Sequence, residues 1–176
     1  PTDLYIMNGI ENFAGQNITS KIVEPEQILD AINEDVAVLL LTQVHYKTGV
    51  IRDMAEINRR AHEVGVLVVW DLSHSAGAIP LDLNASEADF AVGCGYKFFN
   101  GGPGAPAFIY VAKRHQNDQS PVLSGWFGHQ DPFLFTDDYA PANDVRKFLC
   151  GTPPVLALTV LEIGVDIFCE VDQHLL

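Results

Sequence analysis

Short apolar runs alternate with helical and loop-like segments between residues 36 and 111. Val36–Leu41 and Val66–Trp70 are continuous apolar runs, a pattern typical of strands that are buried on both faces. The intervening segment, DMAEINRRAHEVG, keeps its apolar residues on one helical face, opens on Asp53 as an N-cap and stops at Gly65. Together they predict one β-α-β unit with parallel strands and a right-handed crossover.

Two further apolar runs extend this unit. Asp89–Cys94 predicts a third strand of the sheet. Pro106–Val111 follows after a short Gly/Pro loop that leaves no room for a crossover helix, so we expect it to return antiparallel. Helical spacing predicts one helix over residues 25–33 and another from residue 154 onwards. No repeat or linker divides the chain. The sequence therefore predicts one α/β domain with a mostly parallel sheet flanked by helices.

The composition and net charge limit the kinds of molecule that the protein is expected to bind. The chain has 176 residues, 48% of them hydrophobic and 19% charged, which is ordinary for a globular domain with a full core. Its formal net charge is -13 and its isoelectric point is near 4.6. Nucleic acid or an anionic membrane surface would require a basic stripe, which the sequence lacks. We therefore expect small-molecule chemistry.

The cysteines and the ends of the sequence indicate its cellular context. The three cysteines, Cys94, Cys150 and Cys169, show no C-x-x-C spacing, so neither a disulfide framework nor a zinc site is predicted. A reducing compartment fits, and no signal-like or long apolar segment opens the chain, so we expect a cytoplasmic protein. The chain starts at Pro1 and ends in DQHLL, which resembles an interrupted helix, and we expect it to be a fragment.

Several common functional motifs are missing from the sequence. The six histidines show no H-E-x-x-H or comparable ligand spacing, so we expect no metal site. They are His45, His62, His74, His115, His129 and His174. Gly93 and Gly95 lack the third glycine of a dinucleotide fingerprint, and the serines beside His74 are not in a G-x-S-x-G elbow.

Polar residues follow the apolar runs at the positions where ligands usually bind. In an open parallel sheet this position lies beyond the carboxyl ends of the strands. If the predicted strands are neighbours, their trailing side chains converge at one edge of the sheet. These side chains are Thr42, Asp71, His74, Tyr96 and Lys97.

Lys97 stands out because the surrounding run, GCGYKFFNGGPG, is otherwise glycine, aromatic and apolar. Its aliphatic side chain could lie on apolar surface while its ammonium group is in water. Alternatively, it is a lysine with a depressed pKa whose neutral amine attacks a carbonyl. Asp71 at the end of the neighbouring strand could form an ion pair with it, or the two could be halves of a pyridoxal phosphate site.

Longer motifs favour the cofactor site. WDLSHSAGAIPLDL, then Lys97 in GCGYKFFNGGPG, then SGWFGH and LCGTPP resemble the kynureninase family, pyridoxal phosphate enzymes of the class V aminotransferase group with fold type I. The D-x-x-H motif with a downstream lysine is shared across class V, whereas GYK-x-x-NGGPG with SGWFGH is more specific to kynureninases. The resemblance covers nearly the whole chain. It implies that residues 1–176 are the central part of the cofactor-binding large domain, without its N-terminal part or the C-terminal small domain.

The resemblance also implies roles for the residues at the sheet edge. Lys97 would form the Schiff base with pyridoxal phosphate, and Asp71 would pair with the pyridine nitrogen. His74 and Tyr96 would line the cofactor. We further expect the Tyr96 phenol to be the general acid of the reaction, which makes Lys97, Tyr96 and Asp71 the expected catalytic residues.

Four further cofactor contacts follow from the same resemblance. Thr42 and Asp3 match contact positions in LTQVHYKTG and PTDLY, both of which we place at strand ends. Trp126 in SGWFGH and Thr152 in CGTPP match positions that reach the cofactor phosphate across the interface of a homodimer with shared active sites.

The activity implied is hydrolysis of L-kynurenine or 3-hydroxykynurenine, giving anthranilate and L-alanine from kynurenine, in tryptophan catabolism. One alternative is another class V enzyme, such as a cysteine desulfurase. That chemistry needs a mobile cysteine, whereas Cys94 is in a predicted strand and Cys150 is hemmed by its neighbours. The other alternative is a non-catalytic α/β binding module in which Lys97 and Asp71 form a buried ion pair.

Overall fold

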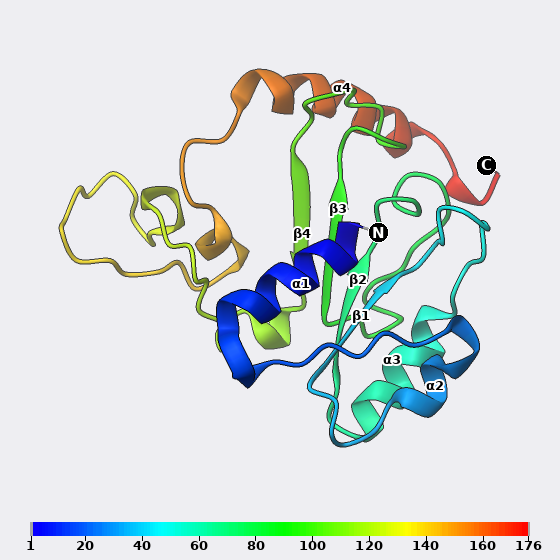
Figure 1. The fold of residues 1–176 in the computed structure, drawn as a ribbon. Coiled ribbons are helices and arrows are strands. Elements are labelled where there is room, and N and C mark those ends of the chain that lie inside the picture. The colour runs from blue at the N-terminus through cyan, green and yellow to red at the C-terminus, as the bar shows by residue number, and fades with distance from the viewer. Residues whose placement is uncertain (1, 176) are drawn as a thin grey trace.

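The computed structural model describes residues 2–175, except for the side chains of residues 16 and 174, and its centre is a four-stranded sheet (Figure 1). The strands β1 (Val38–Thr42), β2 (Leu67–Asp71), β3 (Phe90–Cys94) and β4 (Ala107–Val111) lie side by side in sequence order. The first three are parallel and β4 is antiparallel to β3. The predicted strands, their order as neighbours and the antiparallel return are confirmed.

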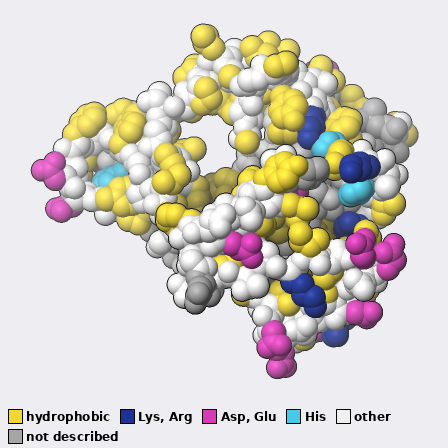
Figure 2. Space-filling model, viewed as in Figure 1, with side chains coloured by type: hydrophobic (Ala, Val, Ile, Leu, Met, Phe, Trp, Pro, Cys, Tyr) yellow, Lys and Arg dark blue, Asp and Glu magenta, His cyan; other side chains and the backbone are white. Residues whose placement is uncertain are grey.

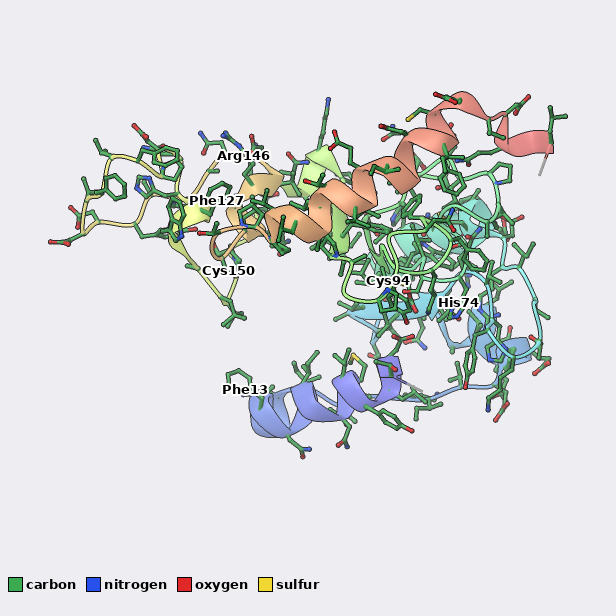
Figure 3. The ribbon with its side chains drawn as sticks, turned by 90° about the horizontal axis from the view of Figure 1, so that it is seen from above. Phe13, His74, Cys94, Phe127, Arg146 and Cys150 are labelled. Atoms are coloured by element: carbon green, nitrogen blue, oxygen red, sulfur yellow. The ribbon has the colours of Figure 1, made fainter. Side chains whose placement is uncertain are left out.

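Helices lie on both sides of this sheet. The α-helices are α1 (Thr2–Ala14), α2 (Ile28–Ala31), α3 (Met54–Glu63) and α4 (Val155–Glu170). The 3-10 helices are η1 (Gly15–Asn17), η2 (Pro25–Gln27), η3 (Lys113–His115), η4 (Trp126–Gly128), η5 (Val145–Phe148) and η6 (Gln173–Leu175). Viewed from above, α1 and α4 are on opposite sides of the sheet (Figure 3). No helix within residues 2–175 is long and apolar enough to cross a membrane.

Two helical predictions need correction. The helix expected over residues 25–33 begins as the 3-10 turn η2 and ends at Ala31, because Ile32 adopts an extended backbone and is buried in the core. The segment PTDLY, expected at a strand end, lies in α1 from Thr2 onwards. The helix α1 buries none of its residues within this chain, although Ile6, Ile10 and Phe13 recur along it at helical spacing.

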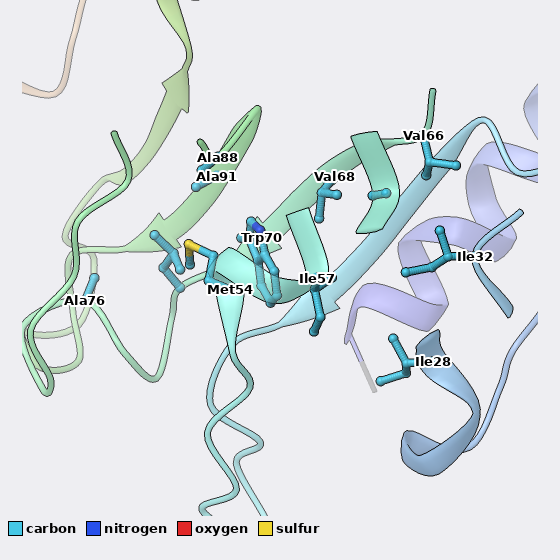
Figure 4. Close-up of a cluster of buried hydrophobic side chains, with 12 residues drawn as sticks. Ile28, Ile32, Met54, Ile57, Val66, Val68, Trp70, Ala76, Ala88 and Ala91 are labelled. Atoms are coloured by element: carbon cyan, nitrogen blue, oxygen red, sulfur yellow. The ribbon is translucent and has the colours of Figure 1, made fainter. Parts of the chain in front are cut away.

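The helix α3 forms as its sequence predicts and covers one face of the sheet. The Asp53 carboxylate accepts the backbone N–H of Glu56 at 3.0 Å, which caps the helix start. Its apolar side chains pack in one core cluster with Val68 and Trp70 of β2 (Figure 4). The Trp70 indole also donates to Asn58 Oδ1 at 2.9 Å, so the polar atom buried with that ring is satisfied.

A buried carboxylate ties the far end of the sheet together. Asp89, directly before β3, is only 1% exposed. Its oxygens accept the Val68 N–H at 2.9 Å and the Arg114 guanidinium at 2.6 Å, and they lie 2.9 and 2.8 Å from Nε2 of His62 and His115. Burial disfavours the charged form, but these hydrogen bonds outweigh it and lower the pKa of Asp89 to about 2.

Replacing this carboxylate should destabilise the fold. We expect Asp89→Asn to lower the free energy of unfolding by about 3 kcal/mol at neutral pH, because the groups around it lose their buried anion. The pKa of Asp89 is below its unfolded value of 3.8. Its contribution is therefore complete above about pH 4 and is lost as the pH falls towards 2.

Urea unfolding followed by circular dichroism measures this difference at several pH values. The exposed Asp30→Asn is the matched control and should change stability by less than about 0.5 kcal/mol. Equal stability of Asp89→Asn and the wild-type protein at pH 7 would show that the cluster is energetically neutral.

Candidate functional site

The carboxyl ends of β1, β2 and β3 meet at one edge of the sheet. Thr42 and Asp71 are direct partners in the parallel register of β1 and β2, and Asp71 also pairs with Val92 of β3. The Asp71 carboxylate accepts the Ser73 N–H at 2.8 Å, which starts the turn that carries His74. Lys97 follows the end of β3 on the loop to β4.

The structure brings Lys97 and His74 into direct contact. Lys97 Nζ lies 3.1 Å from His74 Nε2. Burial lowers the pKa of His74 below its ordinary value, and the nearby Lys97 charge lowers it further, against the opposing charges of Asp71 and Asp3. At neutral pH the imidazole is therefore uncharged, and its Nε2 accepts a hydrogen bond from the lysine ammonium.

Asp3 comes to the same place from α1. It lies in the first turn of that helix, not at a strand end as predicted. Burial raises the pKa of Asp3, and the Asp71 carboxylate raises it further, whereas Lys97 and His74 lower it. The site thus combines two carboxylates, an amine and an imidazole within electrostatic reach of one another.

Two tyrosines border this group. Lys97 Nζ lies 5.4 Å from the centroid of the Tyr96 ring, which is within cation–π range. The ring of Tyr46 stacks on the His74 imidazole, with centroids 5.9 Å apart. Tyr96 was expected here, whereas Tyr46 was not. The signal that could have found Tyr46 is its place in HYKTG, just beyond the end of β1 at the same sheet edge.

The ion-pair interpretation of Lys97 is wrong for the described part of the chain. No ion pair joins Asp71 and Lys97 among residues 2–175, and the contacts of the Lys97 amine are with His74 and the Tyr96 ring. Lys97 is half-buried. The lysine therefore keeps its amine at the sheet edge without a carboxylate bound to it.

The glycines around Lys97 allow the loop to pack tightly. A Cβ on Gly95 would lie 2.7 Å from the carbonyl oxygen of Pro106, and one on Gly164 of α4 would collide with the carbonyl of Phe99. Both positions therefore need a residue without a side chain. The helix α4 consequently presses on the segment just after Lys97, which helps to fix where the lysine backbone lies.

Trp126 and Thr152 lie elsewhere. They belong to a loop-rich arm, residues 121–153, which extends from the body of the molecule (Figure 1). Phe127 and Cys150, beside these residues on the arm, are well separated from His74 in the view from above (Figure 3). Within this chain, the structure does not bring Trp126 or Thr152 to Lys97.

The arm has a definite structure of its own. Gly125 packs against the backbone of Cys150 so closely that a Cβ would collide with it, which joins the SGWFGH and LCGTPP motifs. A pocket of about 470 Å³ lies beside them, lined in part by Trp126 and Tyr139. Hydrophobic side chains cover much of the arm, with acidic residues at its tip (Figure 2). Phe135 there is 81% exposed.

Among the described residues, no cysteine has a hydrogen bond with Lys97 or His74, although the Cys94 thiol lies 4.0 Å from the Ser73 carbonyl in the turn that carries His74. Cys94 is half-buried in β3 and Cys169 is exposed on α4. Cys150 is exposed and not hemmed in as expected, and its thiol donates to the Leu123 carbonyl at 3.3 Å on the arm. Among the described residues, no group of three or more His, Cys, Asp or Glu side chains could hold a metal ion.

Curated relatives of this chain are kynureninases. The kynureninase of Deinococcus radiodurans is 49% identical over 172 residues, and that of Pseudomonas fluorescens is 45% identical over 174 residues. Both alignments cover 98% of this chain but 42% of the relative. The chain therefore spans about two fifths of the length of the curated relatives it matches, and the resemblance seen in its motifs is confirmed.

Solved structures share its fold. A mutant of C-DES with glycine covalently linked to its PLP cofactor matches with a TM-score of 0.77 at 17% identity, over 98% of this chain and 48% of that one. A cysteine desulfurase from Thermococcus onnurineus NA1 matches with a TM-score of 0.75 at 21% identity, over 94% and 42%. The predicted α/β fold of type I is confirmed. A family model described as aminotransferase class-V matches residues 13–174, and the chain belongs to this family.

Proposed function

We propose that this chain is the central part of the large domain of a kynureninase that hydrolyses L-kynurenine to anthranilate and L-alanine with the help of pyridoxal phosphate. The observation that carries the proposal is the Lys97 amine, held 3.1 Å from a neutral imidazole beside the carboxyl end of β2. The kynureninase relatives, at 43–49% identity, support this reaction over others in the family.

The side chains at the sheet edge fit the cofactor. Lys97 offers an amine that can bond to an aldehyde carbon. No carboxylate among the described residues forms an ion pair with this amine. Asp71 offers an anion for the protonated pyridine nitrogen. Thr42, Asp3, His74 and Tyr96 would provide further polar contacts.

Each residue then has a definite task. Bound pyridoxal phosphate supplies an electron sink for the substrate carbon that carries the amine. Asp71 would hold the proton on the pyridine nitrogen, and the Lys97 amine would move the proton at the substrate α-carbon. A water molecule is needed at the γ-carbonyl to release the acyl group. Tyr96 would donate a proton to the β-carbon of the remaining substrate fragment.

The role of Tyr96 can be separated from simple binding. We expect Tyr96→Phe to bind the cofactor with unchanged affinity and to lower the turnover of kynurenine about 100-fold, because a general acid typically contributes that much. Cofactor affinity comes from absorbance titration, and turnover from steady-state assays. A weakened affinity with normal turnover at saturating cofactor would instead make Tyr96 a phosphate contact.

The phosphate contacts would come from a second subunit. We propose that Trp126 and Thr152, on the arm, complete the site of the partner in a homodimer, which accounts for their separation from Lys97 and for the exposed aromatic side chains around them. The substrate would be kynurenine or its 3-hydroxy form. Unpaired cysteines suit a cytoplasmic enzyme.

A direct assay tests the proposal on the protein that carries this chain. Incubation with pyridoxal phosphate and L-kynurenine should release anthranilate, followed by its fluorescence, and an equal amount of alanine. Release of sulfide from cysteine without cleavage of kynurenine would assign a desulfurase instead. If the protein neither absorbs in the visible with pyridoxal phosphate nor turns over either substrate, it is a binding module.

A further inference from the structure

The orientation of the His74 imidazole depends on few contacts. Its Nε2 lies 3.1 Å from Lys97 Nζ. Within residues 2–175, no hydrogen bond to its Nδ1 is formed. A histidine that presents one ring nitrogen to a partner is usually fixed by a hydrogen bond at the other nitrogen. A different contact must therefore hold this ring.

Tyr46 provides that contact. Its ring centroid is 5.9 Å from that of His74, and the two planes are inclined by 30°, an offset-stacked arrangement. Tyr46 is 44% exposed, so burial against the core does not explain its position. Its larger ring covers one face of the imidazole and restricts rotation of the histidine side chain.

The loop that carries Tyr46 is well braced. The His45 N–H donates to the Val50 carbonyl at 2.9 Å, and the Gly49 N–H donates to the His45 carbonyl at 2.8 Å. The His45 ring also lies 3.0 Å from the Thr48 hydroxyl. Gly49 has a φ of +70°, which favours glycine and closes the turn. Tyr46 is therefore displayed from a compact turn next to the end of β1.

We infer that Tyr46 is a positioning residue, whose ring holds the His74 imidazole so that Nε2 accepts a hydrogen bond from the Lys97 amine. Tyr46 acts through His74 and touches no reacting atom. The inference rests on the proposed function in one respect: Lys97 must be the amine that reacts. Its consequence is that the contact between Lys97 and His74 depends on a tyrosine from a different strand end.

Several charged and aromatic groups around His74 and Lys97 influence how the labelling of Lys97 depends on pH. Asp3 of α1 and Asp71 of β2 influence both His74 and each other, and the Tyr96 ring faces the Lys97 amine. Lys47 Nζ lies 5.7 Å from the centroid of the Tyr46 ring. Because Tyr46→Leu also removes the ring beside Lys47, Tyr46→Phe, which keeps that ring, is its matched control.

The reactivity of Lys97 in the cofactor-free protein tests the inference without relying on enzyme activity. Formaldehyde and cyanoborohydride methylate neutral amines, and peptide mass mapping gives the extent at each lysine as a function of pH. A hydrogen bond to the ammonium favours the charged form. Loss of the acceptor should therefore move the labelling midpoint of Lys97 to lower pH.

We expect Tyr46→Leu to lower this midpoint by about 0.5 pH unit, and Tyr46→Phe, which keeps the ring, to leave it unchanged. His74→Phe should produce the same downward shift, and adding Tyr46→Leu to it should have no further effect, because both act through one hydrogen bond. Lys113, outside the site, is the internal reference in every digest.

An unchanged Lys97 midpoint in Tyr46→Leu would overturn the inference and leave Tyr46 with a packing role alone. Additive shifts in the double variant would also overturn it, because Tyr46 would then act on Lys97 independently of His74. The kynurenine assay is separate from these measurements. A protein with the expected shifts but no kynurenine cleavage would refute the proposed function and keep the contact between Tyr46, His74 and Lys97.

Discussion

Borohydride reduction of the protein with bound pyridoxal phosphate is expected to leave a pyridoxyl group on Lys97 and on no other lysine. The Lys97 amine is half-buried at the sheet edge with a neutral imidazole as its partner. Lys147 is buried against the carbonyls of Gln116 and Gln119, which hold its ammonium in place. The contacts of the Lys97 amine are with His74 Nε2 and the Tyr96 ring, so among the described residues no carbonyl or carboxylate competes for it.

Peptide mass mapping after proteolysis locates the label. Lys97→Arg keeps the positive charge but cannot form the covalent link, so it should carry no label and should lose more than about three orders of magnitude in turnover, or about 4 kcal/mol of transition-state stabilisation. Lys113→Arg is the matched control and should remain fully labelled at Lys97. A pyridoxyl group on Lys47 or Lys113, or no label at all, would reject the assignment.

Asp71→Asn should leave cofactor binding nearly intact while lowering turnover by about three orders of magnitude, which corresponds to about 4 kcal/mol in the activation free energy. The asparagine keeps the shape of the side chain and can still accept the Ser73 N–H. It removes the negative charge that, in the proposed site, would keep the pyridine nitrogen protonated, and with it much of the electron withdrawal on which the proposed reaction would depend.

Steady-state kinetics and absorbance titration separate the two effects. Asp35→Asn changes an exposed carboxylate away from the carboxyl ends of the strands and should match the wild-type protein in both measurements. Near wild-type turnover by Asp71→Asn would show that this carboxylate has no electronic role. Loss of cofactor binding with normal turnover at saturating cofactor would likewise assign it to binding alone.

The sheet and the meeting of its strand ends could be predicted because the signals are local and strong. Val66–Trp70 is an uninterrupted apolar run, and Asp53 and Gly65 mark the two ends of the helix before it. Parallel neighbours then place Thr42 beside Asp71 without any further information. The geometry of a parallel sheet thus brings together residues that are far apart in the sequence.

Other features depend on contacts that have no local signal. The helix α1 has apolar residues at helical spacing, at Ile6, Ile10 and Phe13, but buries none of them, so packing against the core did not mark it. The stacking of Tyr46 on His74 requires two turns from different strands to take up particular conformations. The motif SGWFGH led us to expect that Trp126 acts across a dimer interface, but the shape of the arm that carries it has no local signal.

The Asp89 cluster and the Lys97 site lie at opposite ends of β3. The strand has five residues, and at roughly 3.3 Å per residue it spans about 16 Å. Substitutions this far apart, without shared partners, usually have additive effects. A protein engineer could therefore select stabilising changes around Asp89 and changes around Lys97 in separate libraries, and then combine the best variants with little epistasis between them.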